Sequence, residues 1–97
     1  MDTNANENGA YIADIIFTGH VQGVGFRFKC FRIAASFEVS GFVQNLPDGS
    51  VRLAAAGKKS EVQAFVAEVK KSLSPFIRNA DESDGFGENP YKSFDIR

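Results

Sequence analysis

The chain has 97 residues, which suffice for one compact domain but not for two. Hydrophobic residues make up 43% of the sequence and charged residues 24%, a composition typical of globular proteins and unlike that of disordered or repetitive chains. The chain has eleven Lys and Arg residues and twelve Asp and Glu residues, so its formal net charge is -1. No overall basic field would therefore attract nucleic acid or an anionic membrane. Any anion-binding site must therefore be local.

The first ten residues differ in composition from the rest of the chain. Residues 1–10 are rich in Asn and acidic, without the basic start and apolar block of a signal peptide or the length of a membrane span, and they predict a disordered polar tail. Residues 11–97 are expected to form a single domain. The one cysteine, Cys30, cannot form an internal disulfide and lies in an apolar stretch, which favours a cytoplasmic protein.

The first half of this domain predicts a strand, a glycine-rich loop, a helix and a hairpin. Residues 11–18 are nearly all apolar and rich in β-branched and aromatic types, as in a central strand covered on both faces. From Phe26 onward, apolar residues recur at helical spacing. Val39–Asn45 and residues 50–56 predict two antiparallel strands, because the segment between them contains the turn-forming residues Pro, Asp and Gly.

The second half predicts another helix and the remaining strands. Ser60 and Gln63 have the spacing of a capping box at a helix start, and apolar residues follow at i, i+3, i+4, i+7 and i+11. Residues 76–80 predict a short edge strand, residues 81–92 an acidic loop with Gly and Pro, and residues 93–97 a closing strand. The resulting order, βαββαβ, predicts an α+β fold of the ferredoxin-like sandwich type, with an antiparallel sheet of four or five strands and two helices on one face.

The segment GHVQGVGFR, residues 19–27, contains the most informative residues for function. Three glycines in seven residues let a backbone turn its amide groups inward on an anion, and the helix that begins near Phe26 adds its own unpaired amides and the positive end of its dipole. Arg27 stands at this junction, and its guanidinium can bond two phosphate oxygens at once. A tight turn beside a solvated arginine explains the same residues equally well, so the residues alone leave both interpretations open.

Other types of site have less support in the sequence. The loop lacks the Gly-Lys-Ser/Thr ending of a nucleotide-binding P-loop and the spacing of a dinucleotide-binding motif, so no nucleotide cofactor is expected. His20 is the only histidine and no cysteine cluster accompanies it, so no metal site is expected and His20 is interpreted as a polar loop residue. Asn45, taken alone, is typical of a residue that precedes a turn.

Two motifs and their spacing resemble the acylphosphatase family. GHVQGVGFR is followed, eighteen residues after Arg27, by Asn45 within GFVQN, and then by DGSV. The resemblance extends from Tyr11 to Arg97. Three positions depart from the usual family pattern, with His20 in place of Arg or Lys, Phe42 in place of Trp, and Glu38 where the first helix usually ends in Gly.

The resemblance implies a function and a role for each motif residue. It implies metal-independent hydrolysis of the carboxyl–phosphate bond of small acyl phosphates, with inorganic phosphate as a product, by a monomer that needs no cofactor, nucleic acid or membrane. Arg27 would clamp the phosphate and Asn45 would orient the attacking water. The phosphate would be bound by loop amides at Val21, Gln22, Gly23, Val24 and Gly25.

Two alternatives share the predicted fold. An RNA-binding module has the same order of strands and helices but needs aromatic residues on its third strand, where this chain has VRLAAA. A phosphate-binding or interaction domain without turnover would retain the loop and lack hydrolysis.

Overall fold

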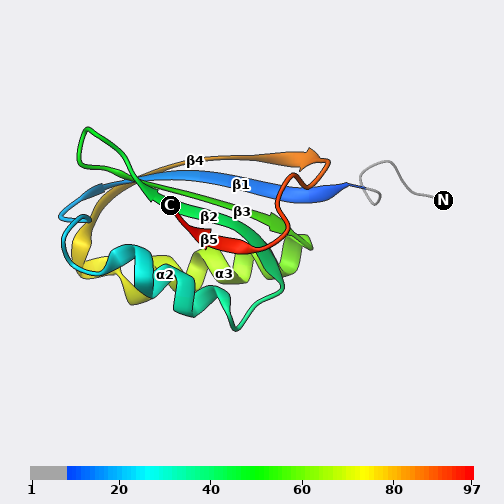
Figure 1. Ribbon diagram of the computed structural model, residues 1–97, viewed down its shortest axis with the longest axis horizontal. Coiled ribbons are helices and arrows are strands. Elements are labelled where there is room, and N and C mark those ends of the chain that lie inside the picture. The colour runs from blue at the N-terminus through cyan, green and yellow to red at the C-terminus, as the bar shows by residue number, and fades with distance from the viewer. Residues whose placement is uncertain (1–8) are drawn as a thin grey trace.

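The computed structural model describes residues 9–97, which fold into a five-stranded sheet with the helices packed on one face (Figure 1). Residues 1–8 of the predicted tail lie outside the described residues, and Ala10 is already part of the first strand. The elements in chain order are β1 Ala10–Gly19, α2 Phe26–Ala34, β2 Val39–Asn45, β3 Val51–Gly57, α3 Lys59–Ser72, the 3-10 helix η1 Ser74–Phe76, β4 Ile77–Gly87 and β5 Phe94–Ile96.

The strands lie in the order β4-β1-β3-β2-β5. β1 pairs with β3 and β4, and β2 pairs with β3, all antiparallel, as the predicted ferredoxin-like sandwich requires. β5 pairs with β2 in parallel, with Gly41 opposite Phe94 and Val43 opposite Ile96. The sheet is therefore mixed rather than wholly antiparallel, because β5, at the edge of the sheet, lies parallel to β2.

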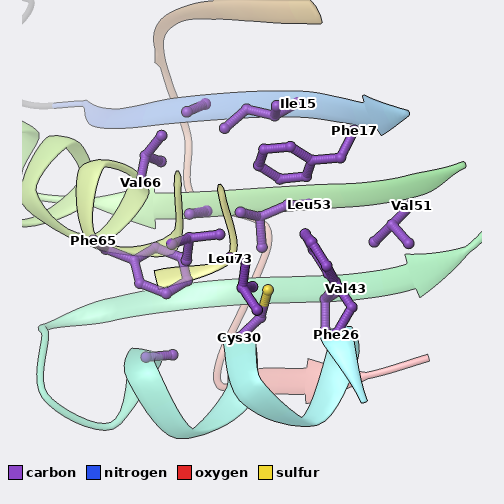
Figure 2. Packing of buried hydrophobic residues seen from close by; sticks show 14 of the residues in the cluster. Ile15, Phe17, Phe26, Cys30, Val43, Val51, Leu53, Phe65, Val66 and Leu73 are labelled. Atoms are coloured by element: carbon purple, nitrogen blue, oxygen red, sulfur yellow. The ribbon is translucent and has the colours of Figure 1, made fainter. Parts of the chain in front are cut away.

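The core lies between the sheet and the helices, as Figure 2 shows. Alternate residues of β1 point toward the helices and are buried, among them Ile15 and Phe17. α2, which packs against β2, contributes Phe26 and Cys30, and α3 contributes an apolar face that includes Phe65. Burial raises the pKa of the Cys30 thiol to about 12, so this thiol is part of the core and stays protonated.

The prediction that β1 is covered on both faces is wrong. Its burial alternates along the strand, with Ile12 and Ile16 only half-buried on the face away from the helices. That face also holds the ion pair between Asp14 and Arg52, whose atoms lie 2.6 Å apart. An antiparallel sheet with helices on one side can leave its other side open to water, so an apolar strand need not be covered twice.

The predicted capping box at Ser60 and Gln63 is also wrong. α3 begins at Lys59, its N-cap is Lys58, and no side-chain hydrogen bond caps it within the described residues. Ser60 is therefore already inside the helix. The helix is stabilised by burial of the face that carries Val62, Phe65, Val66 and Val69, since packing contributes more to most protein helices than their caps do.

The end of α2 shows how the chain accommodates Glu38, one of the three departures from the resembled sequence pattern. The helix stops at Ala34, and short i to i+3 bonds, such as that from the Phe37 amide to the Ala34 carbonyl at 3.1 Å, close its last turn. The main-chain NH of Glu38 then donates to a carboxylate oxygen of Glu61 at 2.8 Å. A carboxylate from the neighbouring helix thus binds the backbone after α2.

One long strand replaces the predicted short strand at residues 76–80 and the first part of the acidic loop predicted at residues 81–92, of which only residues 88–92 lie outside it. β4 runs from Ile77 to Gly87 and pairs with β1 along almost its whole length, from Thr18 opposite Asn79 to Ala10 opposite Gly87. Acidic residues are tolerated there because β4 is an edge strand whose side chains are mostly exposed. No helix within residues 9–97 is long and apolar enough to cross a bilayer.

Candidate active site

The glycine-rich loop joins the end of β1 to the start of α2. Gly19 sits at an irregularity in the pairing of β1 with β4, where an added Cβ would approach the main-chain oxygen of Phe76 to 2.5 Å. Val21 is fully buried and anchors the loop in the core. Gly23 and Gly25 have φ angles of 79° and 77°, a left-handed conformation that side chains other than glycine rarely adopt. Their positions explain why the motif needs glycines there.

The first turn of α2 presents free amide groups to the loop. Its N-cap is Gly25, which has no side chain to accept a hydrogen bond from those amides, and its first turn contains no acidic residue. The first intrahelical bond runs from the Lys29 amide to the Gly25 carbonyl at 3.0 Å. The preceding amides and the positive end of the helix dipole are therefore directed at the same place as the loop, where they favour an anion.

Arg27 lies in this first turn and its side chain reaches β5. The residue is half-buried, and its Nη1 donates to the main-chain oxygen of Arg97 at 2.7 Å. Arg97 is itself held against β2, because its amide donates to the Val43 carbonyl at 2.8 Å. The guanidinium therefore has a defined direction that depends on the pairing of β5 with β2, and it still has other NH groups for a ligand.

Asn45 is the last residue of β2 and faces the same cavity as the loop. A cavity of about 260 Å³ is lined by Asn45, Arg27, Gly23 and Gly25 together with Val21, Phe26, Phe28 and Ile96. The structure thus brings the two motifs together, although eighteen residues separate Arg27 from Asn45 in the sequence. Within this lining of described residues, Arg27 alone carries a charge, so the electrostatics of the cavity favour an anion.

The seven residues predicted for the site fall into two groups. Five of them line the cavity, namely Val21, Gly23, Gly25, Arg27 and Asn45. Gln22 and Val24 are half-buried and are not part of the lining. His20 is exposed and borders a separate hollow with Pro75 and Arg78, while its amide bonds to the Phe76 carbonyl at 2.9 Å.

Gln22 has a structural contact that its place in the motif did not reveal. Its side-chain Nε2 donates to the carbonyls of Leu46 at 2.8 Å and of Ser50 at 2.9 Å, at the two ends of the turn that follows Asn45. This side chain therefore ties the glycine-rich loop to the β2–β3 turn. The sequence signal that could have suggested it is an amide-bearing residue inside an otherwise apolar and glycine-rich loop.

Two apolar residues of the cavity were also missed by the sequence analysis. Phe28 follows Arg27 on α2 and is 56% exposed, and Ile96 on β5 is 42% exposed. Neither has a chemical group that marks it as functional, and only the tertiary structure places both beside Arg27. Among the described residues, no three His, Cys, Asp or Glu side chains gather where they could hold a metal ion.

By its fold and its site, the molecule is a ferredoxin-like α+β sandwich whose glycine-rich loop opens onto a small cavity with an arginine and an asparagine. A family model described as Acylphosphatase matches residues 13–96. The chain belongs to the acylphosphatase family.

Relatives and solved structures agree with this assignment. The acylphosphatase of Archaeoglobus fulgidus is 38% identical over 85 residues, which cover 86% of this chain and 93% of that protein. The acylphosphatase of Listeria welshimeri is 44% identical over 61 residues, which cover 63% of this chain and 66%, just under two thirds, of that protein. The crystal structure of acylphosphatase from Bacillus subtilis superposes with a TM-score of 0.80 at 28% identity, covering 90% of this chain and 98% of that one.

Proposed function

We propose that the protein hydrolyses the carboxyl–phosphate bond of small acyl phosphates to a carboxylate and inorganic phosphate. Membership of the acylphosphatase family supports this reaction class. The single observation that carries the proposal is that Arg27, Asn45 and the glycines of the loop line one small cavity. A volume of about 260 Å³ lies below the ~300–1,000 Å³ of pockets for drug-sized ligands, which favours a small substrate.

In the proposed mechanism, the phosphate binds at the loop and at the start of α2. The amides of residues 21–25, with those of the first helical turn, and the guanidinium of Arg27 hold its peripheral oxygens. This arrangement neutralises the charge that spreads over those oxygens in a loose transition state. Gln22 and Val24 take part through their main-chain NH groups, since their side chains are not in the lining.

Asn45 is proposed to orient the water that attacks phosphorus in line with the leaving carboxylate. As the oxygen of water bonds to phosphorus, the bond from phosphorus to the acyl oxygen breaks, and the water proton passes to a phosphate oxygen. A carboxylate is a good leaving group, so positioning and charge neutralisation can supply the catalysis without a strong base or a protein nucleophile. His20, which lies outside the cavity lining, has no step in this mechanism.

Metal independence, a cytoplasmic location and a monomeric state are part of the same proposal. Arg27 and the loop amides provide positive charge that a metal ion would otherwise supply, which supports metal independence. The lone buried thiol of Cys30 and the absence of any expected disulfide support a cytoplasmic location. Activity measured with a chelator present tests the first of these directly.

The central test compares Arg27→Ala, Arg27→Lys and Asn45→Ala with the wild-type protein on acetyl phosphate. Arg27→Ala is expected to lower kcat/KM by about 10³-fold or more, and Arg27→Lys to recover only part, because lysine lacks the two-pronged geometry. Asn45→Ala is expected to lower kcat far more than it changes KM, because Asn45 acts on the water. Arg78→Ala, which removes an exposed arginine on β4, is the matched control and should retain full activity.

Substrate comparison separates this proposal from the alternatives. ATP and a simple phosphomonoester should be hydrolysed far more slowly than acetyl phosphate. Full activity in purified Arg27→Ala would refute the assigned role of Arg27. A wild-type protein that is stabilised against melting by inorganic phosphate, yet hydrolyses no acyl phosphate, would instead be a phosphate-binding domain without turnover.

A further inference from the structure

Two exposed large apolar side chains, Phe28 and Ile96, lie at the candidate active site. Within residues 9–97, four large apolar side chains have more than 40% of their surface exposed, and these are Phe28, Phe31, Phe86 and Ile96. Two of the four, Phe28 and Ile96, line the cavity that holds Arg27 and Asn45. Exposing a phenylalanine ring to water is unfavourable, so a pair of such residues at one cavity indicates a ligand that covers them.

The two residues come from different elements, and each is next in the chain to one partner of the hydrogen bond between Arg27 and Arg97. Phe28 is next to Arg27 on the first turn of α2, and Ile96 on β5 precedes Arg97, whose main-chain oxygen accepts the bond from Arg27. The buried part of the cavity is formed by Val21 and Phe26, which are at most 2% exposed. A substrate whose phosphate is held by Arg27 and the loop amides therefore has Phe28 and Ile96 beside it at the solvent side.

We propose that Phe28 and Ile96 form the subsite for the acyl group, and that the protein prefers acyl phosphates whose acyl group is small and apolar or aromatic. The inference rests on the proposed function, because it names the substrate class of that same site. An aromatic acyl group can pack on the Phe28 ring and an aliphatic one on Ile96, and both contacts remove apolar surface from water.

A charged side chain, that of Arg32, also lies near the subsite, where it could bind an acyl group that carries a second carboxylate. The guanidinium carbon of Arg32 lies 5.9 Å from the centre of the Phe28 ring, where it can hold the ring by a cation–π contact. Arg32 is not part of the cavity lining, and no acidic side chain is among the described residues that line it. An acyl group with a second carboxylate would have to leave the apolar surface to reach Arg32, so such substrates are expected to be poorer.

The test measures kcat/KM for acetyl, butyryl, benzoyl and succinyl phosphates with the wild-type protein, Phe28→Ala, Ile96→Thr and Phe31→Ala. The wild-type protein should have a higher kcat/KM for benzoyl than for acetyl phosphate. Phe28→Ala should reduce the ratio of these two values about tenfold, because the benzoyl group loses an apolar contact in the pocket. Ile96→Thr should reduce the ratio of butyryl to acetyl phosphate. Intrinsic reactivity cancels, because each variant is compared with the wild-type protein on the same pair of substrates.

Phe31→Ala is the matched control, since Phe31 lies on the same helix and is 42% exposed but does not line the cavity. It should leave every ratio unchanged. Ratios that stay at the wild-type value in both Phe28→Ala and Ile96→Thr, or a wild-type preference for succinyl over butyryl phosphate, would overturn the acyl subsite while leaving the proposed hydrolysis intact. A wild-type protein that hydrolyses none of the four substrates would overturn the proposed function and the subsite together.

Discussion

Replacing Gln22 by methionine would remove the two side-chain hydrogen bonds that join the glycine-rich loop to the β2–β3 turn. Nε2 of Gln22 donates to the carbonyls of Leu46 and Ser50, 2.8 and 2.9 Å away. Methionine is close to glutamine in length and volume, so the substitution removes the donors and leaves the packing nearly unchanged. The effect should therefore report on the hydrogen bonds themselves.

The expected loss of stability depends on which hydrogen bonds the carbonyls of Leu46 and Ser50 keep in the variant. The Ser50 carbonyl still accepts the Leu46 amide at 2.8 Å, and the Leu46 carbonyl still accepts the Gly49 amide at 3.1 Å. Neither acceptor is left unpaired, so the cost is that of two ordinary hydrogen bonds, about 2 kcal/mol in total, without an added desolvation penalty. For a domain of this size that loss corresponds to a decrease of roughly 10 °C in Tm.

Activity should fall as well, because the same bonds set the position of the loop relative to Asn45. A displacement of about 1 Å in a catalytic arrangement can cost ~10²-fold in rate, so kcat should decrease by about 10- to 100-fold. Urea unfolding measures the stability change, and acetyl phosphate hydrolysis measures kcat. The matched control is Gln44→Met, since no hydrogen bond of the Gln44 side chain is found within the described part of the chain. An unfolding midpoint and a kcat that both equal those of the wild-type protein would refute the reasoning.

Two further predictions concern the close pairing of β2 with β3 and a side-chain contact between β1 and β4. Gly41→Ala should destabilise the fold by at least about 3 kcal/mol, because Gly41 has a φ of 149° and an added Cβ would lie 1.9 Å from the main-chain oxygen of Ala54. Gly49→Ala, where the new Cβ has open space, should cost only about 1 kcal/mol. Equal urea midpoints for the two variants would contradict this reasoning. The hydrogen bond from the Tyr11 hydroxyl to Asp84, with burial, raises the pKa of Tyr11 above its ordinary value of 10.0. Since the folded-state pKa is the higher one, this contribution to stability is complete below pH 10.0 and is lost as the pH rises through the folded value. Ultraviolet titration should show a tyrosine that ionises late and that disappears in Tyr11→Phe, and a titration unchanged by that substitution would disprove the assignment.

Local patterns in the sequence were enough to predict the elements that frame the site. The apolar run at residues 11–18, the helical spacing after Phe26 and the turn residues between β2 and β3 are each patterns among residues close in the chain. The glycines and Arg27 could also be recognised together from the sequence, because the left-handed residue at the helix start and the arginine in the first turn belong to one short segment. The fold class therefore followed from the order of these segments.

Predictions failed where the outcome depended on partners far away in the sequence. The capping box at Ser60 was a valid local pattern, but the N-cap lies two residues earlier, at Lys58, because the apolar face of the helix, rather than its cap, sets its position. Residues 81–87 have the composition of a loop, yet they form an edge strand because β1 offers unpaired backbone groups along its full length. The parallel pairing of β5 with β2 had no local signal at all.

By itself the sequence determined which residues could bind an anion, since the glycines, the helix start and Arg27 lie within nine consecutive residues. It indicated a role for Asn45 only through a family resemblance. The tertiary structure decided that Asn45 faces the same cavity, that Gln22 holds the loop to its turn, and that Arg97 directs the guanidinium. It also decided that Phe28 and Ile96 stand exposed at that cavity. The physical reason is that conformation and capping act between neighbours in the chain, whereas a site is formed by sheet pairing and packing that bring distant residues together.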